Sequence, residues 1–111
     1  MLRPTEFYTL LALAAGPQHG YALVQRIERE SEGRLSILPG NLYAVIRRLE
    51  TGGLLRKSHT KPRREEDQRR RYFELTPRGR KALTDEAQHI ARLHDRLETL
   101  TLHTAKRSGG S

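Results

Sequence analysis

Apolar residues in the N-terminal half of the chain recur at the three- and four-residue spacing that is typical of amphipathic helices. The spacing predicts a first helix over residues 5–15, capped by Thr5, and a second helix over residues 20–31. A third helix is predicted to begin at Pro39, because proline fits the first turn of a helix, and to end at the two glycines 52–53. Its inward face consists of four apolar residues, Leu42, Val45, Ile46 and Leu49.

The pattern changes after the third helix to two short runs that predict strands, over residues 54–60 and 70–75. The segment between them is too polar to pack, so we expect a solvated loop that joins two antiparallel strands. Thr76-Pro77 then combines a helix cap with a proline at the first helical position. A long helix is therefore predicted from there to about His103.

Three helices followed by a hairpin are typical of a winged helix, which is a variant of the helix-turn-helix domain. The predicted fold class is therefore mainly α (α+β). Residues 1–76 are predicted to form the winged-helix domain, residues 77–105 a C-terminal dimerisation helix, and residues 106–111 a disordered tail. A length of 111 residues is sufficient for one such domain with an appended helix.

Composition argues against several classes of site. The chain has no cysteine, so it cannot form a disulfide framework, a thiolate nucleophile or a cysteine metal site. Among five histidines only His89 and His94 are close in sequence, and their spacing places them about 140° apart on a helix. We therefore expect no metal site, no catalytic site and no cofactor. No apolar run is long enough to span a bilayer, and the predicted location is the cytoplasm.

The net charge of +8 is carried by one stretch, residues 47–81. This stretch contains thirteen lysines and arginines and five acidic residues, whereas the remainder of the chain contains eight of each kind. A protein that is neutral except over one third of its length presents a positive face to a negative partner. Nucleic acid is the commonest such partner, because each neutralised phosphate releases a condensed counterion.

The outer face of the third helix has the residue types that a DNA-recognition helix needs. Ala44 is small enough to let the backbone enter the major groove, while Arg47 and Arg48 can reach guanine or phosphate. In the first turn, Gly40 and Asn41 can offer backbone N–H groups and an amide to a phosphate. The alternative is an ordinary amphipathic helix, whose outer face is charged in any case.

The predicted hairpin carries further candidate DNA contacts. Lys61, Arg63 and Arg64 precede an acidic tip and are the preferred contacts of a wing with the DNA backbone or minor groove. Arg70 and Arg71 are weaker candidates, because strand alternation must aim one of them away from the groove. The alternative is a solvated loop in which neighbouring charges compensate one another.

The last helix carries an apolar seam of the coiled-coil type. Its members follow one another at spacings of three, four and three: Ile90, Leu93, Leu97 and Leu100. A hydrophobic content of 35% favours a partner subunit that covers part of this surface. The predicted homodimer interface combines the seam with Phe7, Leu10 and Leu11 of the first helix. The alternative is that the seam packs back on the chain's own first helix.

Three segments match a known family pattern, and the match covers about residues 5–83, which are most of the chain. They are HGYALVQRIERES (residues 19–31), LPGNLYAVIRRLETGGLLRK (residues 38–57) and RRRYFELTPRGRKAL (residues 69–83). These segments closely resemble PadR-type transcriptional regulators, in which a "GY" pair is followed by a PGTLY element, a basic aromatic wing strand and an "LT" pair. The single C-terminal helix is similar to that of the small subfamily.

The resemblance implies a homodimeric winged-helix repressor that binds an inverted-repeat operator. By position it implies DNA contacts at Tyr21, Asn41, Tyr43 and Arg47. Two positions depart from the family pattern: Asn41 replaces a threonine or serine, and Leu38 replaces a serine that caps the helix. The alternatives are that Tyr43 is a packed flank residue and that Tyr21 packs in the core.

Many members of the family are released from DNA by a small aromatic or amphipathic ligand near the dimer interface, so the resemblance also implies such an effector. An interface without a ligand is the alternative, because the chain lacks tryptophan and only Phe7, Tyr8 and Tyr21 are expected near such a site. Two rival functions stay open at this point: a protein-interaction adaptor that kept the fold without binding DNA, and an RNA-binding winged helix.

Overall fold

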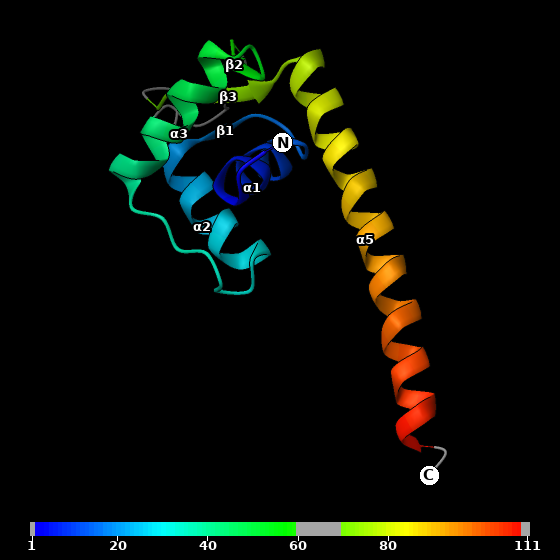
Figure 1. Ribbon diagram of the computed structural model, residues 1–111. Coiled ribbons are helices and arrows are strands. Elements are labelled where there is room, and N and C mark those ends of the chain that lie inside the picture. The colour runs from blue at the N-terminus through cyan, green and yellow to red at the C-terminus, as the bar shows by residue number, and fades with distance from the viewer. Residues whose placement is uncertain (1, 60–69, 110–111) are drawn as a thin grey trace.

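The computed structural model describes residues 2–59 and 70–109 (Figure 1). Three helices, α1 (Pro4–Leu13), α2 (Gly20–Glu30) and α3 (Pro39–Thr51), pack together against a small antiparallel sheet. The last helix, α5 (Pro77–Gly109), begins beside the sheet and extends away from the other helices as one long rod (Figure 1). The predicted class, mainly α with a small sheet and a long C-terminal helix, is confirmed.

The first helix begins at Pro4 rather than after Thr5. Arg3 is the N-cap residue, with extended backbone angles (φ −73°, ψ 155°). Pro4 takes the first helical position because its ring fixes φ and it has no N–H to leave unsatisfied. The Glu6 carboxylate then accepts a 2.8 Å hydrogen bond from the Arg3 backbone N–H. The predicted Thr5 cap is therefore wrong, and the acidic side chain of Glu6 is fixed at the start of α1.

The sheet contains a strand that has no signal in the sequence. Its strand order is β1-β3-β2, where β1 is Gln18–His19, β2 is Leu55–Lys57 and β3 is Tyr72–Leu75. The predicted antiparallel hairpin of β2 and β3 is confirmed, with shorter strands. β1 pairs with the other side of β3, and its two residues are too few to show alternation. The predicted loop over residues 61–69 lies outside the described residues.

The core is built around the apolar face of α3. Its four predicted inward residues are at most 4% exposed: Leu42, Val45, Ile46 and Leu49. The same buried cluster includes residues of α1, α2, α5 and the sheet, among them Leu13, Leu23, Leu55, Phe73 and Leu83. Fully burying one such side chain contributes about 1.5–3 kcal/mol. The apolar side of α3 is thus seated in the core, and its opposite side is left at the surface.

A tight junction fixes the start of α5 against the turn that follows α3. Thr76 caps α5 as predicted: its hydroxyl accepts a 3.0 Å hydrogen bond from the Gly79 backbone N–H and donates to the Gly53 carbonyl. Gly79 has to be glycine, because an added Cβ would lie 1.8 Å from the Leu54 carbonyl oxygen. The direction of α5 is therefore set by the same turn that ends α3.

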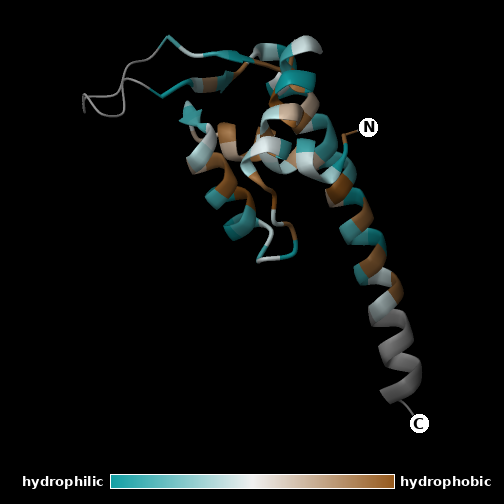
Figure 2. Cartoon of the chain, turned by 90° about the vertical axis from the view of Figure 1, so that its left-hand side faces the viewer, coloured by the Kyte–Doolittle hydropathy of each residue, from teal (hydrophilic) through white to brown (hydrophobic). Residues whose placement is uncertain are grey.

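α5 leaves the core soon after its first turns. Leu83 is buried, whereas the four seam residues are 43–62% exposed: Ile90, Leu93, Leu97 and Leu100. Figure 2 shows hydrophobic positions, in brown, along the described part of α5. The helix continues to Gly109, so the predicted disorder is wrong for residues 106–109. The alanine, lysine and arginine at 105–107 are good helix formers, which extend the helix beyond its predicted end.

Leu10 does not belong to the exposed apolar surface. It is fully buried in the chain's own core, so its predicted contact with a partner subunit is wrong. Phe7 and Leu11 are half-buried and pack at the edge of the same core. Periodicity cannot separate these cases, because burial inside a chain and burial between chains both require an apolar face.

Candidate nucleic-acid interface

The surface of α3 opposite the core carries five of the predicted DNA contacts. Gly40, Asn41, Ala44, Arg47 and Arg48 are all exposed. At 100° per residue, the four buried positions of the helix leave these residues on its outer half. The N-terminal end of α3 lies on the side of the globule away from α5 (Figure 1). The structure thus gathers on one outer surface the residues that the sequence predicts for the recognition helix.

Two further predicted contacts, Tyr21 and Tyr43, lie where α3 passes the start of α2. An added Cβ on Gly20 would lie 2.7 Å from the Tyr43 hydroxyl oxygen, so the Tyr43 ring can lie there only beside a glycine. Tyr21 follows Gly20 directly and is 61% exposed, which overturns the alternative that it packs in the core. Both tyrosines are therefore at the surface near the N-terminus of α2, where backbone N–H groups favour anions.

A basic cleft lies between α3 and the wing strands. Seven residues line its volume of about 170 Å³: Tyr43, Ile46, Arg47, Glu50, Lys57, Arg71 and Phe73. Three are cationic and come from α3, from β2 and from the residue before β3, against a single glutamate. Sequence reasoning misses Lys57 as a site residue and ranks Arg71 as a weaker candidate, because only the register of β2 and β3 brings both beside Arg47.

Arg70 has a different neighbour from Arg71. Its Nη1 lies 3.0 Å from Nε2 of His19, on the side of β1. The His19 ring is stacked on Tyr21, with centroids 6.5 Å apart, and meets Tyr72 edge-on at 5.4 Å. Strand alternation therefore separates the two arginines, and Arg71 is the one that joins the α3 side. His19 and Tyr72 form an aromatic cluster beside Tyr21 that the sequence does not reveal.

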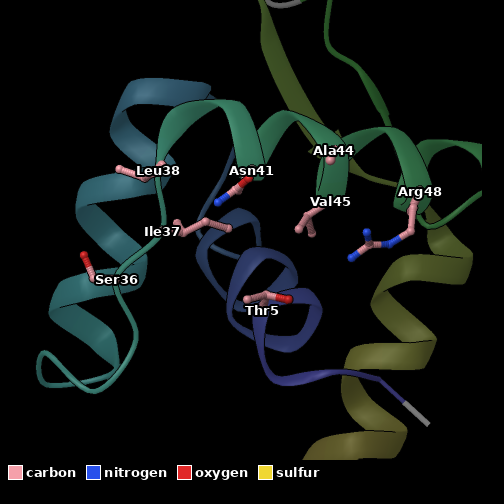
Figure 3. Close-up of a pocket in the computed structure, with 8 residues that line it drawn as sticks. All are labelled: Thr5, Ser36, Ile37, Leu38, Asn41, Ala44, Val45 and Arg48. Atoms are coloured by element: carbon pink, nitrogen blue, oxygen red, sulfur yellow. The ribbon is translucent and has the colours of Figure 1, made fainter.

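Arg48 faces α1 rather than the wing. Its Nε lies 3.8 Å from Oε2 of Glu6, the carboxylate that is fixed at the start of α1. Figure 3 shows the guanidinium group directed into the space beside α1. An open cleft of about 550 Å³ on this flank is lined by Thr5, Ser36, Ile37, Leu38, Asn41, Ala44, Val45 and Arg48 (Figure 3). The adjacent arginines of α3 thus lie in different surroundings, Arg47 among cations and Arg48 beside an acid.

The stem of the wing is held by an ion pair between its two strands. Arg56 Nε contacts Glu74 Oε2 at 3.0 Å, and the two residues are register partners in β2 and β3. A hydrogen bond from Ser58, and then the one from Arg56, holds the pKa of the Glu74 carboxyl below its ordinary value. Glu74 is therefore ionised at neutral pH and offsets one positive charge of the stem.

Some predicted features fall outside these surfaces. The wing contacts Lys61, Arg63 and Arg64 lie outside the described residues. Among the residues that are described, no group of three His, Cys, Asp or Glu side chains is arranged to hold a metal ion. Within residues 2–59 and 70–109, no helix combines the length and the apolar character needed to cross a membrane.

A helix seated by its apolar side, a hairpin beside it and a capped C-terminal helix define a protein of the winged-helix class. Residues 9–85 of the chain match the family described as the transcriptional regulator PadR-like family. The chain therefore belongs to the PadR-like family, whose members regulate transcription and are not enzymes.

The chain is also similar to proteins of Streptomyces fradiae and Mycobacterium tuberculosis. An uncharacterised 37.1 kDa protein in transposon TN4556 of Streptomyces fradiae is 45% identical over 92 residues, which are 83% of this chain. The matched part spans only 24% of that protein's length. Transcriptional regulator Rv3488 of Mycobacterium tuberculosis is 33% identical over 87 residues, which cover 78% of this chain and 76% of that protein.

Solved structures share the fold at low sequence identity. A PadR family transcription regulator from Clostridium difficile superposes with a TM-score of 0.71 at 15% identity, over 87% of this chain and 97% of that chain. Bacillus subtilis PadR in complex with operator DNA superposes with a TM-score of 0.63 at 20% identity, over 77% of this chain and 47% of that chain. At these identities the likeness shows the fold alone.

Proposed function

We propose that this chain is a sequence-specific DNA-binding transcriptional regulator, a repressor that binds an inverted-repeat operator as a homodimer in the cytoplasm. The observation that carries the proposal is the exposed outer face of α3 with the basic cleft beside it. Family membership supports a role in transcription. Bacillus subtilis PadR, which shares the fold, was solved in complex with operator DNA.

In the proposed complex, α3 enters the major groove with its first turn leading. Ala44 lets the backbone approach closely, and the Asn41 amide is of the kind that pairs with adenine. Backbone N–H groups at Gly40 and Asn41 bind a phosphate at the helix N-terminus. Arg48 lines the same flank as Asn41 and supplies a second donor toward base edges.

The basic cleft is proposed to bind the DNA backbone. Arg47, Lys57 and Arg71 line one cleft from three elements, so a single phosphate group can meet several cations there. The Tyr43 hydroxyl and the exposed Tyr21 extend this backbone contact toward α2. Lys61, Arg63 and Arg64, which lie outside the described residues, are proposed as further contacts with the DNA backbone.

The α5 seam is proposed to join two copies of the chain. Its four members are all exposed and follow the heptad spacing of a coiled coil. Phe7 and Leu11, half-buried on the helix that α5 packs against, extend the proposed interface. Two-fold symmetry would present two α3 helices to two half-sites, and the rigid Thr76–Gly79 junction would fix their separation.

A small aromatic or amphipathic effector is proposed to bind near this interface and to release the DNA. Phe7 and Tyr8 support the proposal, because they are half-buried neighbours whose rings meet edge-on at 5.7 Å. They lie on α1, the helix against which the start of α5 packs. A ligand bound there could change the angle between the two chains and hence the spacing of the two α3 helices.

The test is the salt dependence of binding to duplex DNA, followed by fluorescence anisotropy. If a dimer neutralises about six to ten phosphates, the plot of log K against log salt has a slope of about −5 to −9. A slope near zero would contradict the proposal. Tight preference for structured RNA would instead favour an RNA-binding winged helix. A protein partner retained after charge reversal at Arg63 and Arg64, without DNA binding, would favour an adaptor.

A further inference from the structure

The N-cap of α3 is a large hydrophobic residue, Leu38, whose side chain is mostly exposed. Leu38 is 71% exposed, more than any member of the α5 seam. A single exposed leucine is common on a protein surface. The position of Leu38 is unusual, because it stands where a helix begins.

An N-cap position favours a side chain that accepts hydrogen bonds. Leu38 has the extended backbone angles of a cap (φ −73°, ψ 145°) but makes no side-chain hydrogen bond to the first turn. α3 therefore begins without this stabilisation, and the exposure of Leu38 means that burial within the chain does not offset the loss. A leucine at a position that favours a hydrogen-bond acceptor, with no compensating burial inside the chain, indicates a contact with another molecule.

Leu38 lies at the end of α3 that would enter a DNA groove first. Recognition helices contact base edges mainly with their N-terminal residues. Figure 3 shows Leu38, Asn41 and Ala44 along the first half of α3, around the open cleft beside α1. Ile37 lines the same cleft, so the side chains of Ile37 and Leu38 form an apolar edge of the cleft that also contains Asn41.

The major groove offers one apolar group at the base edges, which is the C5-methyl group of thymine. A 5-methylcytosine carries the same group at the same place. We propose that Leu38 is a specificity-determining residue that packs against the C5-methyl group of a pyrimidine in each half-site. The inference rests on the proposed DNA binding and adds the chemical group that this chain reads next to Asn41.

The experiment uses the full chain and the duplex that it enriches from a random pool. Each thymine is replaced in turn by deoxyuridine, which lacks only the methyl group, and each cytosine by 5-methylcytosine. Binding is measured by fluorescence anisotropy at one salt concentration. We expect about a fourfold loss at one thymine per half-site, or about a fourfold gain at one cytosine, as one buried methyl group implies. The first result identifies thymine as the source and the second methylated cytosine.

Two variants separate this contact from an effect on folding. Leu38→Ala is expected to remove the dependence on the methyl group. Leu38→Ser places a hydrogen-bond acceptor at the cap, so we expect unchanged or higher stability in urea together with the same loss of methyl dependence. Indifference of the unmodified chain to every methyl group, or full sensitivity in both variants, overturns the inference and leaves the proposed function intact. A chain that binds no duplex at all overturns both.

Discussion

α3 and α5 are both amphipathic, but their apolar faces have opposite surroundings. The four apolar residues of α3 are at most 4% exposed, whereas the four seam residues of α5 are at least 43% exposed. α3 lies among α1, α2 and β2, while α5 leaves the globule after Leu83 (Figure 1). An amphipathic pattern therefore predicts a face that must be covered, and only the fold determines whether the same chain covers it.

The polar faces of the two helices differ as well. Along α5, Lys81 Nζ lies 2.9 Å from Asp85 Oδ2, and the ring nitrogen Nε2 of His94 lies 3.4 Å from Glu98 Oε1. On α3, Arg47 instead shares a cleft with cations of the wing. The outer face of α3 therefore retains an attraction for an anion, whereas the described part of α5 offers mainly an apolar seam to a partner.

Charge in the α5 seam has the largest expected effect. Leu93→Glu with Leu97→Glu would place four charges in the proposed dimer interface, and each uncompensated buried charge costs several kcal/mol. We expect monomers in sedimentation equilibrium, with the dimer dissociation constant raised at least about 100-fold. Gln88→Glu with Thr99→Glu adds the same charge to the opposite side of α5 and is expected to leave the dimer intact. A double seam variant that stays dimeric would show that the seam is not the interface.

The second-largest effect is expected from shortening a buried side chain of α3. Leu49 is buried, so Leu49→Ala is expected to lower the free energy of unfolding by about 2–5 kcal/mol. Thr51 is exposed on the same helix, and Thr51→Ala is expected to change it by less than about 0.5 kcal/mol. Urea denaturation measures both. Equal effects at the two positions would mean that α3 is not seated by its apolar side.

Two substitutions on the outer face of α3 separate base contacts from phosphate contacts. Arg47→Ala is expected to weaken binding by about 1.5–3 kcal/mol on every duplex and to reduce the salt slope by about one per contact. Asn41→Ala is expected to cost about 1–3 kcal/mol on the enriched duplex only. Anisotropy titrations against enriched and random DNA make the comparison. The assignment of the basic cleft to the backbone fails if Arg47→Ala spares random DNA.

A smaller effect is expected from the acid beside Arg48. Glu6→Gln keeps an acceptor for the Arg3 N–H but removes the charge that holds Arg48, so DNA affinity is expected to rise. A partly exposed surface pair of this kind contributes about 0.2–1 kcal/mol, which corresponds to about a 1.5- to 5-fold gain. When Glu6→Gln is made in an Arg48→Ala chain, the gain in DNA affinity should be smaller. Only the long-range repulsion between the Glu6 carboxylate and the DNA phosphates is then removed. An equal gain in both backgrounds would exclude a role for the ion pair.

The smallest effect concerns the wing stem and its pH dependence. The pKa of Glu74 is lower in the folded chain than its ordinary value, so its ionised form favours folding. This stabilisation is present above the ordinary carboxyl pKa of about 4.3 and is lost as pH falls through the lower folded value. Wild type should therefore be more stable than Glu74→Gln at pH 7, with the gap closing near pH 3. Urea titrations at each pH measure the difference in unfolding free energy between the two proteins. A difference that does not change with pH would exclude the ionisation of Glu74 as its cause.

The sequence predicts the helices of this fold well, because three of them carry long periodic faces. α3 is predicted from Pro39, from its four apolar residues and from the glycines after it, and the structure agrees at each point. Two predictions from the sequence fail for local reasons. Helix α1 begins at Pro4, so Thr5 is not its cap, and β1 is missed because two residues are too few to show a pattern. Leu10 fails for a different reason, since its apolar face fits a core and an interface equally well.

The site is only half predictable from the sequence. The outer face of α3 follows from helical geometry, so Asn41, Ala44 and Arg47 are found together as expected. The gathering of Lys57 and Arg71 beside that face depends on strand register, which no local pattern encodes. The same holds for the Arg48–Glu6 and Gly20–Tyr43 contacts, because each joins elements that are distant in sequence.

The proposed function requires that α3 reads DNA and that α5 pairs two chains. Selection of bound duplexes from a random pool, followed by sequencing, tests both halves at once. We expect enrichment of an inverted repeat whose half-site centres are about 10–10.5 base pairs apart, or a multiple of that distance. The Leu93→Glu, Leu97→Glu variant should lose the repeat. Enrichment of no motif, or of one unrepeated half-site by the unmodified chain, would contradict the account.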